Sequence, residues 1–233
     1  MTKNILKSII SLIIITLIGC SNSQDSSEQK QITINTNNLV LKEDLWHIKG
    51  QTRPFSGKGI SYFKNGKIES EAFFVNGKLN GVLTLYYPNG VLEQKVHFNN
   101  GLENDTSLSY YHNGQLEALM VWKDGKENGS LIRYYNNGQV ESDGKMINGK
   151  EEGYWRFYYR TGIQKSFEIY KHGKLVDSSF SYFENGQIES KGYFENDLKN
   201  GRFVYYDSIS GNIDGYQIFK NDSLVKTIKI KDR

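Results

Sequence analysis

The chain has 233 residues, and its 29 basic and 26 acidic side chains leave a net charge of only +3. No basic cluster follows one face of the sequence, which excludes the phosphate-binding surface that nucleic-acid recognition requires. Aromatic residues make up 13% of the chain, with two prolines and 23 glycines, a composition typical of a turn-rich β protein. Because Cys20 is the single cysteine, no internal disulfide can form, and packing and strand pairing must hold the fold.

The start of the chain differs from the rest. Two lysines precede an almost unbroken aliphatic run, residues 9–18, a pattern typical of a signal peptide. The run is shorter than the roughly 20 apolar residues that a membrane-spanning helix needs. Its end, Leu-Ile-Gly-Cys at residues 17–20, resembles the bacterial lipobox, in which cleavage precedes the cysteine and the thiol carries a lipid. We therefore predict a lipoprotein signal peptide over residues 1–19 and lipidation of Cys20; the alternative is an ordinary signal peptide with an incidental thiol.

A lipid on Cys20 predicts the location of the protein. We expect export and lipid anchoring to a bacterial envelope membrane, whether the inner membrane, the outer membrane or the cell surface. Residues 20–38 are polar, glycine-free and poor in large side chains, which predicts a lipidated cysteine followed by a disordered tether. Residues 39–60 contain large apolar side chains but lack the repeat pattern that follows, which predicts an N-terminal cap over a hydrophobic edge.

A pattern of 24 residues recurs through most of the chain, and residues 134–141, Tyr-Tyr-Asn-Asn-Gly-Gln-Val-Glu, are a clear copy of it. A fixed period of this length indicates an array in which each unit is one supersecondary element. An Asn-Gly pair between two strand-like runs is the strongest short hairpin signal, and it predicts a type I′ turn. The pair or its substitute stands at Asn65-Gly66, Asn89-Gly90, Asn113-Gly114, Asn137-Gly138, Thr161-Gly162 and Asn185-Gly186, and a slipped copy ends at Gly211.

These repeats predict an all-β fold, an elongated and twisted single antiparallel sheet of tandem 24-residue β-hairpins. Six repeats occupy residues 61–204, and a degenerate seventh repeat with a C-terminal edge strand occupies residues 205–233. A glycine position joins successive hairpins, and Asp197 and Asp222 replace it in the last two units. Since Asp tolerates the left-handed backbone conformation better than most residues, we expect the same turn there.

Alternation along the strands assigns the side chains to two faces. In the second repeat, Leu83 and Val96 fall on an apolar face, while Tyr86 and Glu93 are predicted to lie opposite each other on the other face. One position on the apolar face is large in every unit, and it predicts a core column: Phe74, Phe98, Trp122, Met146, Tyr170, Phe194 and Phe219.

The pattern does not indicate an enzyme. The four histidines occupy unrelated repeat positions, which argues against a metal site. The glutamates of successive repeats do align, but their strands should lie about 9.6 Å apart, at or beyond the upper limit of about 6.5–9.5 Å for an inverting glycosidase pair. Phosphate-cradling loops, nucleophile elbows and metal-ligand pairs are missing from the sequence. We therefore expect no catalytic residues, no metal and no cofactor.

One tyrosine position on the predicted outer face recurs in all seven units. It serves either packing between hairpins or recognition of a peptide or of sugar rings. In the fifth repeat Phe167 and Ile169 join Tyr158 on this face, and exposed apolar clusters commonly mark interaction sites. The candidate partner-binding residues are therefore Tyr62, Tyr86, Tyr110, Tyr134, Tyr158, Phe167, Ile169, Tyr182 and Tyr206.

The repeated unit, Tyr-Tyr-x-Asn-Gly-x-Leu-Glu followed by an aromatic residue, Asn-Gly-Lys and another glycine, resembles the MORN-repeat variant over residues 55–225. That family includes bacterial lipoproteins described as YwqK-like antitoxins. The resemblance implies an all-β ladder of hairpins and a role in interaction. The fifth repeat departs from the pattern, because Thr161 replaces the asparagine and Lys165 the glutamate.

Together these patterns predict a membrane-anchored, non-enzymatic protein-interaction or scaffold module of the bacterial envelope. Its partner would be an unknown protein or an envelope glycan, and the sequence leaves the oligomeric state open. Two alternatives remain, an antitoxin or immunity protein that neutralises a cognate toxin, and an envelope glycan-binding repeat protein.

Overall fold

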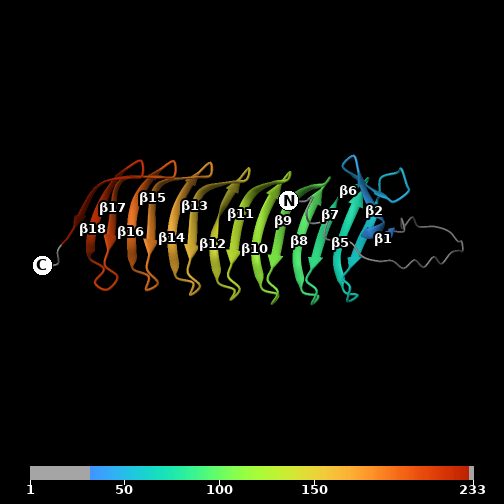
Figure 1. The fold of residues 1–233 in the computed structure, drawn as a ribbon, viewed down its shortest axis with the longest axis horizontal. Coiled ribbons are helices and arrows are strands. Elements are labelled where there is room, and N and C mark those ends of the chain that lie inside the picture. The colour runs from blue at the N-terminus through green and yellow to red at the C-terminus, as the bar shows by residue number, and fades with distance from the viewer. Residues whose placement is uncertain (1–31, 231–233) are drawn as a thin grey trace, which may run out of the picture. The chain divides into compact units, whose positions relative to one another are not determined.

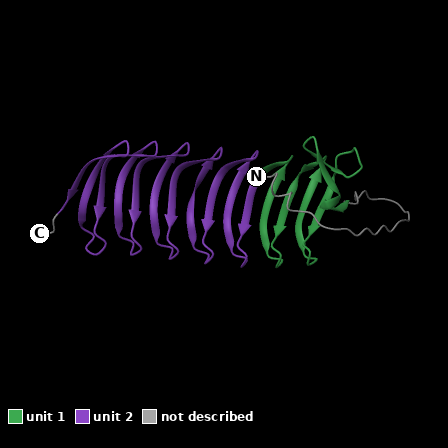
Figure 2. Cartoon of the chain, in the orientation of Figure 1, with its two compact units in different colours: residues 1–103 green, residues 104–233 purple. Residues whose placement is uncertain are grey.

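The computed structural model describes residues 32–230, whose regular structure is almost entirely β (Figure 1). The predicted signal peptide and Cys20 lie outside the described residues. The chain divides within β9 (Leu102–Tyr110) into two compact units, residues 1–103 and 104–233 (Figure 2). Consecutive antiparallel hairpins build both units, so the predicted all-β fold of tandem hairpin repeats is confirmed.

The first unit contains a small hairpin and the first repeats. A separate two-stranded sheet pairs β2 with β3, and the larger sheet pairs β4 with β5 and β7 with β8. The elements of this unit before β9 are β1 (Thr33–Asn35), the 3-10 helix η2 (Thr36–Asn38), β2 (Leu39–Lys42), β3 (Leu45–Ile48), β4 (Gly57–Tyr62), β5 (Ile68–Val75), β6 (Lys78–Leu79), β7 (Gly81–Tyr86) and β8 (Leu92–Asn99).

Part of the predicted tether is folded. Strand β1 pairs in parallel with β4, Ile34 lying opposite Gly59, and η2 follows it directly. The predicted disorder is therefore wrong for residues 33–38. The short strand escaped detection because only one of its three residues is apolar, and its order comes from pairing with a distant strand. The first hairpin also begins at Gly57, inside the range predicted for the cap.

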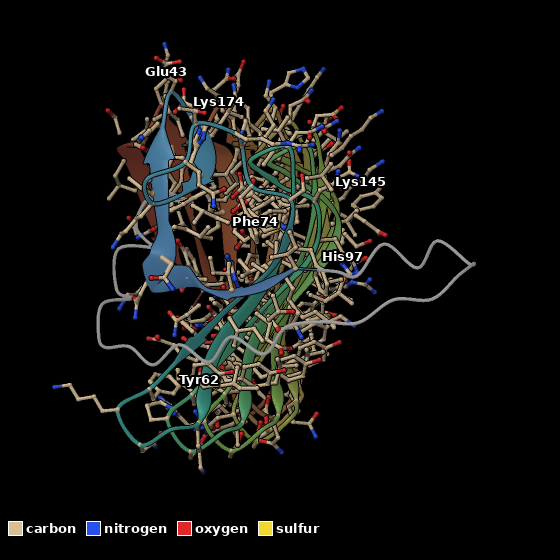
Figure 3. All side chains as sticks on the ribbon, turned by 90° about the vertical axis from the view of Figure 1, so that its right-hand side faces the viewer. Glu43, Tyr62, Phe74, His97, Lys145 and Lys174 are labelled. Carbon is tan, nitrogen blue, oxygen red and sulfur yellow. The ribbon has the colours of Figure 1, made fainter. Side chains whose placement is uncertain are left out.

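The small hairpin covers the core of the first unit. Leu39 and Phe55 are buried against Phe74, Leu83 and Phe98 of the larger sheet. Figure 3 shows Phe74 inside the unit and His97 on its outer surface. The apolar face predicted for the second repeat is therefore confirmed.

The second unit is a run of antiparallel strands, each paired with the next. After β9 they are β10 (Leu116–Lys123), β11 (Lys126–Tyr134), β12 (Val140–Ile147), β13 (Lys150–Tyr158), β14 (Gln164–Lys171), β15 (Lys174–Tyr182), β16 (Ile188–Glu195), β17 (Leu198–Tyr206), β18 (Ile213–Lys220) and β19 (Ser223–Lys229).

The turns at the Asn-Gly pairs differ from the prediction. At the turn after β7 only Gly90 has a positive φ, of 90°. The Gly90 amide donates to the Tyr87 carbonyl at 2.7 Å and the Tyr87 amide donates to the Val91 carbonyl at 2.8 Å. These bonds define a longer turn that ends in a bulge, with glycine in the left-handed conformation. The predicted type I′ turn is wrong here, because the Asn89 side chain accepts from the Val91 amide at 2.9 Å and holds the longer loop.

The bulge shifts the strand register by one residue. Leu85 lies opposite Gln94, but Tyr86 lies opposite Leu92, so Glu93 occupies the bulge. The predicted pairing of Tyr86 with Glu93 is therefore wrong. The apolar pairing farther from the turn, Leu83 opposite Val96, is as expected.

Type I′ geometry occurs instead at the opposite end of the strands, where two residues join successive hairpins. Asn76 and Gly77 both have positive φ, of 47° and 78°. Asp197 and Asp222 replace the glycine with φ values of 72° and 63°, so the predicted left-handed conformation of both is confirmed.

The core of the second unit depends on size complementarity between neighbouring strands. Leu131, Met146 and Trp155 are buried, and Met120, Phe157 and Tyr170 pack against them. Of the predicted core column, Phe74, Phe98 and Met146 are fully buried, and Trp122, Tyr170, Phe194 and Phe219 are half-buried.

Candidate interaction surface

The face of the second unit opposite its core is apolar too. Strand register connects one residue of each strand from β9 to β19 across this outer face. Most of these residues are apolar and half-buried. We call this line of side chains the outer row: Leu108, Leu119, Ile132, Asp143, Arg156, Phe167, Phe180, Lys191, Val204, Tyr216 and Ile228.

The outer row holds one ion pair between its apolar stretches. The Arg156 guanidinium donates from Nε at 3.1 Å and from Nη2 at 2.7 Å, both to Oδ2 of Asp143. The Arg156 side chain is 53% exposed and the Asp143 side chain 21%. Because exposed pairs of this kind contribute at most about 1 kcal/mol to stability, the pair does not account for the apolar side chains beside it.

Aromatic rings cluster next to this ion pair. Tyr154 is 69% exposed and stacks on Phe167, with ring centroids 5.5 Å apart and planes 28° apart. Phe167 also contacts Phe180 at 6.2 Å between centroids, and Ile169 lies opposite Tyr154 across the strands. Phe167 and Ile169 thus lie on the face expected for them. Sequence reasoning missed Tyr154, although alternation from Tyr158 back along β13 could have found it.

The predicted tyrosine positions lie at the strand ends beside the Asn-Gly turns. Tyr62 is 46% exposed, whereas the other six tyrosines are half-buried. Burial raises the pKa of the Tyr158 hydroxyl, and the nearby Asp143 raises it further. In the last unit the Lys191 ammonium lies 5.8 Å from the centre of the Tyr206 ring.

In three repeats the second tyrosine of the pair joins one hairpin to the next, which sequence reasoning did not foresee. The Tyr135 hydroxyl donates to the Tyr158 carbonyl at 2.7 Å, and the Tyr159 hydroxyl donates to the Tyr182 carbonyl at 2.8 Å. Tyr111 makes the same bond to the Tyr134 carbonyl at 2.6 Å. Burial raises the pKa of the Tyr111, Tyr135 and Tyr159 hydroxyls. The repeated tyrosine pair thus has a structural role that needs no ligand.

The turn asparagines make a second connection between hairpins. Asn137 Nδ2 donates to the Arg160 carbonyl at 2.8 Å, while its Oδ1 accepts from the Gln139 amide at 3.1 Å. The Thr161 side chain has no amide group and cannot make this bond. The same connection runs from Asn65 to Pro88, from Asn113 to Asn136 and from Asn185 to Ser208.

The corresponding face of the first unit is more polar. Its row reads Ile60, Glu71, Thr84 and Lys95 across β4, β5, β7 and β8. The Lys58 ammonium forms an ion pair with Glu71 at 2.7 Å. An apolar outer row is therefore a property of the second unit and not a general consequence of the repeat.

Two further features of residues 32–230 bear on function. No three His, Cys, Asp or Glu side chains in this range converge so as to hold a metal ion. The same residues contain no helix that is long and apolar enough to cross a membrane.

The fold and this surface define a tandem β-hairpin repeat protein. Four segments match the family model of the MORN repeat variant, residues 56–76, 79–100, 106–124 and 178–196. Over these four segments the chain resembles the MORN repeat variant, as the sequence predicted. MORN repeats are generally non-catalytic, which indicates a repeat-based binding module. No curated protein matched the sequence.

Proposed function

We propose that this protein is a membrane-anchored, non-enzymatic binding module of the bacterial envelope that holds a protein partner on the outer row. One observation carries the proposal, the apolar outer face of a sheet whose opposite face already holds the core. Apolar clusters on a protein surface commonly mark interaction sites. Tyr154 and Arg156 belong to the residue types that dominate binding energy at protein interfaces.

The chemistry of the surface favours a protein over a glycan. A sugar platform needs a free aromatic face with hydrogen-bonding groups around it. Phe167 covers one face of the Tyr154 ring, and the neighbouring Phe180 and Ile169 side chains have no polar atoms. Such a surface gains most from an apolar protein surface.

Membrane anchoring through Cys20 is the second part of the proposal, and it rests on the lipobox-like sequence. Two lipid chains are needed for stable attachment, and we propose that Cys20 carries them. A Cys20→Ser variant should move from the detergent phase to the aqueous phase on phase partitioning. Partitioning of the unaltered protein into the aqueous phase would contradict the proposal.

Site-specific photo-crosslinking tests the binding surface. A photoreactive residue at Tyr154 of the full chain, in its own envelope, should yield discrete protein adducts. The matched control at Thr84, on the polar outer face of the first unit, should yield several-fold fewer. Equal yields, or no protein adduct at Tyr154, would overturn the proposal. An adduct with wall polymer would support the glycan alternative, and a single adduct with a toxic protein would identify an antitoxin.

A further inference from the structure

We propose that the partner of the outer row is a second copy of this chain, packed face to face about a twofold axis that runs along the strands between Asp143 and Arg156. This inference rests on the proposed function, in which the outer row binds protein, and it adds the identity of that protein.

The order of residues along the outer row is self-complementary. In a twofold dimer each residue meets the residue at the same distance on the other side of the axis. Counted outward, Ile132 meets Phe167 of the second copy, because both lie one strand beyond the ion pair. Leu119 and Phe180 meet in the same way, two strands beyond it. Each of these two contacts joins a branched aliphatic side chain to an aromatic ring. The first charge to face an apolar side chain is Lys191 opposite Leu108, three strands beyond the ion pair and outside the β10–β15 face.

The charges at the centre follow the same symmetry. Asp143 meets Arg156 of the second copy, and Arg156 meets its Asp143, so four charges alternate around the axis. The bonds from Arg156 to Asp143 within one copy use Nε and Nη2 and leave Nη1 out of both. A guanidinium carries five N–H donors, so Nη1 can donate across the interface while the internal bonds persist. Alternation of charge favours this register and disfavours others.

The available area is sufficient. With strands about 4.8 Å apart and about 3.3 Å per residue, the outer face of β10–β15 spans about 29 by 20 Å. Two such faces would bury on the order of 1,200 Å², at the lower end of the range for stable interfaces. Face-to-face sheets pack about 10 Å apart, a distance that half-buried Phe and Leu side chains fill.

Charge exchange between two differently tagged full-length copies tests the dimer. Asp143→Lys leaves both central positions positive, and Arg156→Glu leaves both negative. Co-expressed unaltered copies should capture each other from mild detergent. Two copies carrying Asp143→Lys, or two carrying Arg156→Glu, should lose co-capture at least tenfold, since like charges across an interface are costly. One copy of each should restore it, because the charges are again opposite across the axis.

The internal ion pair is broken in every one of these combinations, so recovery on mixing separates an interface from a role in folding. A second pair of variants, Ile132→Lys and Phe167→Glu, checks the register, and it replaces the first pair if those variants do not fold. Each should weaken self-capture when both copies carry it, and one copy of each should restore capture. Monomeric unaltered protein, undiminished capture by the single variants, or no recovery in either mixture would overturn the dimer. In that event Tyr154 adducts with a different protein would leave the proposed function standing, whereas absence of any protein adduct would remove it.

Discussion

At the scale of single residues, two glycines make room for the largest side chains of the core. A Cβ atom built on Gly144 would lie 2.2 Å from the Trp155 ring, and one built on Gly192 would lie 2.2 Å from the Phe203 ring. Neither glycine has a positive φ, so their role is to leave space. Small and large residues on neighbouring strands therefore fill the core together.

Gly144→Ala should lower the free energy of unfolding by about 1–3 kcal/mol, the usual cost of overpacking a core. Denaturant unfolding measures this loss. The cost should fall when Trp155→Leu is added, because Leu131 occupies the same position in an earlier repeat. An equal cost of Gly144→Ala in both backgrounds would show that the ring is not the obstacle.

At the scale of the hairpin, the asparagine of the turn explains why the fifth repeat is exceptional. Asn137 and Asn185 each connect their turn to a carbonyl of the following turn, and Thr161 interrupts this series. Arg160 strengthens the connection to the preceding turn instead, because its Nη2 donates to Asn136 Oδ1. The fifth turn is thus joined to the fourth by two side chains and lacks the asparagine bond to the sixth.

Thr161→Asn should raise the stability of the protein by about 0.5–1.5 kcal/mol, the net contribution of one hydrogen bond. The new side chain would donate to the carbonyl of Glu184, which lies 23 residues ahead as in the other repeats. Thermal unfolding measures the gain, and Asn137→Thr is the reverse control, with a loss of similar size. A destabilised Thr161→Asn variant would contradict this account of the turn.

The hairpins also show what the sequence could predict. The period, the number of strands per repeat and the apolar face of the second repeat depend on local pattern, and the structure agrees with them. The type I′ turn was predicted at the wrong end of the strands because Asn-Gly stands at both ends, as at Asn76 and Asn89, and the dipeptide alone does not distinguish the two turns.

The outer row was largely missed for a different reason. The second repeat served as the pattern for all the others, and its outer face carries Thr84 and Lys95. Equivalent positions in the second unit carry Ile132 and Phe167. A row that crosses many strands is visible only when the residues of each repeat are compared one by one in the correct register.

At the scale of the whole molecule, tyrosine burial makes stability depend on alkaline pH. Burial raises the pKa of Tyr111, Tyr135, Tyr159 and Tyr205 above the value of 10.0 expected for an exposed tyrosine. The unfolded chain therefore loses these protons at lower pH than the folded chain. Full stability is present below pH 10.0 and declines as the pH rises through the higher folded-state values.

Denaturant unfolding at increasing pH above 10 should show this decline, with phenolate absorbance reporting the titration in parallel. Tyr135→Phe removes one of the titrating groups, so its decline should be shallower. It should also cost about 0.5–1.5 kcal/mol at neutral pH, since the bond to the Tyr158 carbonyl is lost. A stability that stays constant across this range would contradict the burial of these hydroxyls.

The side-chain bonds of the turns connect each hairpin to a neighbouring one, as those from Tyr135 to Tyr158 and from Asn137 to Arg160 show. Each such bond is accepted by a backbone carbonyl of the next hairpin, a group that every repeat supplies. A gene for such a protein could lose a whole 24-residue unit by recombination between its repeated segments. A product without residues 137–160 would keep the alternation of strands, and Tyr135 would donate to the Tyr182 carbonyl in place of the Tyr158 carbonyl, although Thr161 would then stand where Asn137 makes its bond. Removal of residues 137–160 should therefore leave a foldable chain, whereas removal of half a unit would reverse the strand direction at the junction. The number of hairpins can thus change by one repeat at a time during evolution, because the bonds between hairpins recur from repeat to repeat.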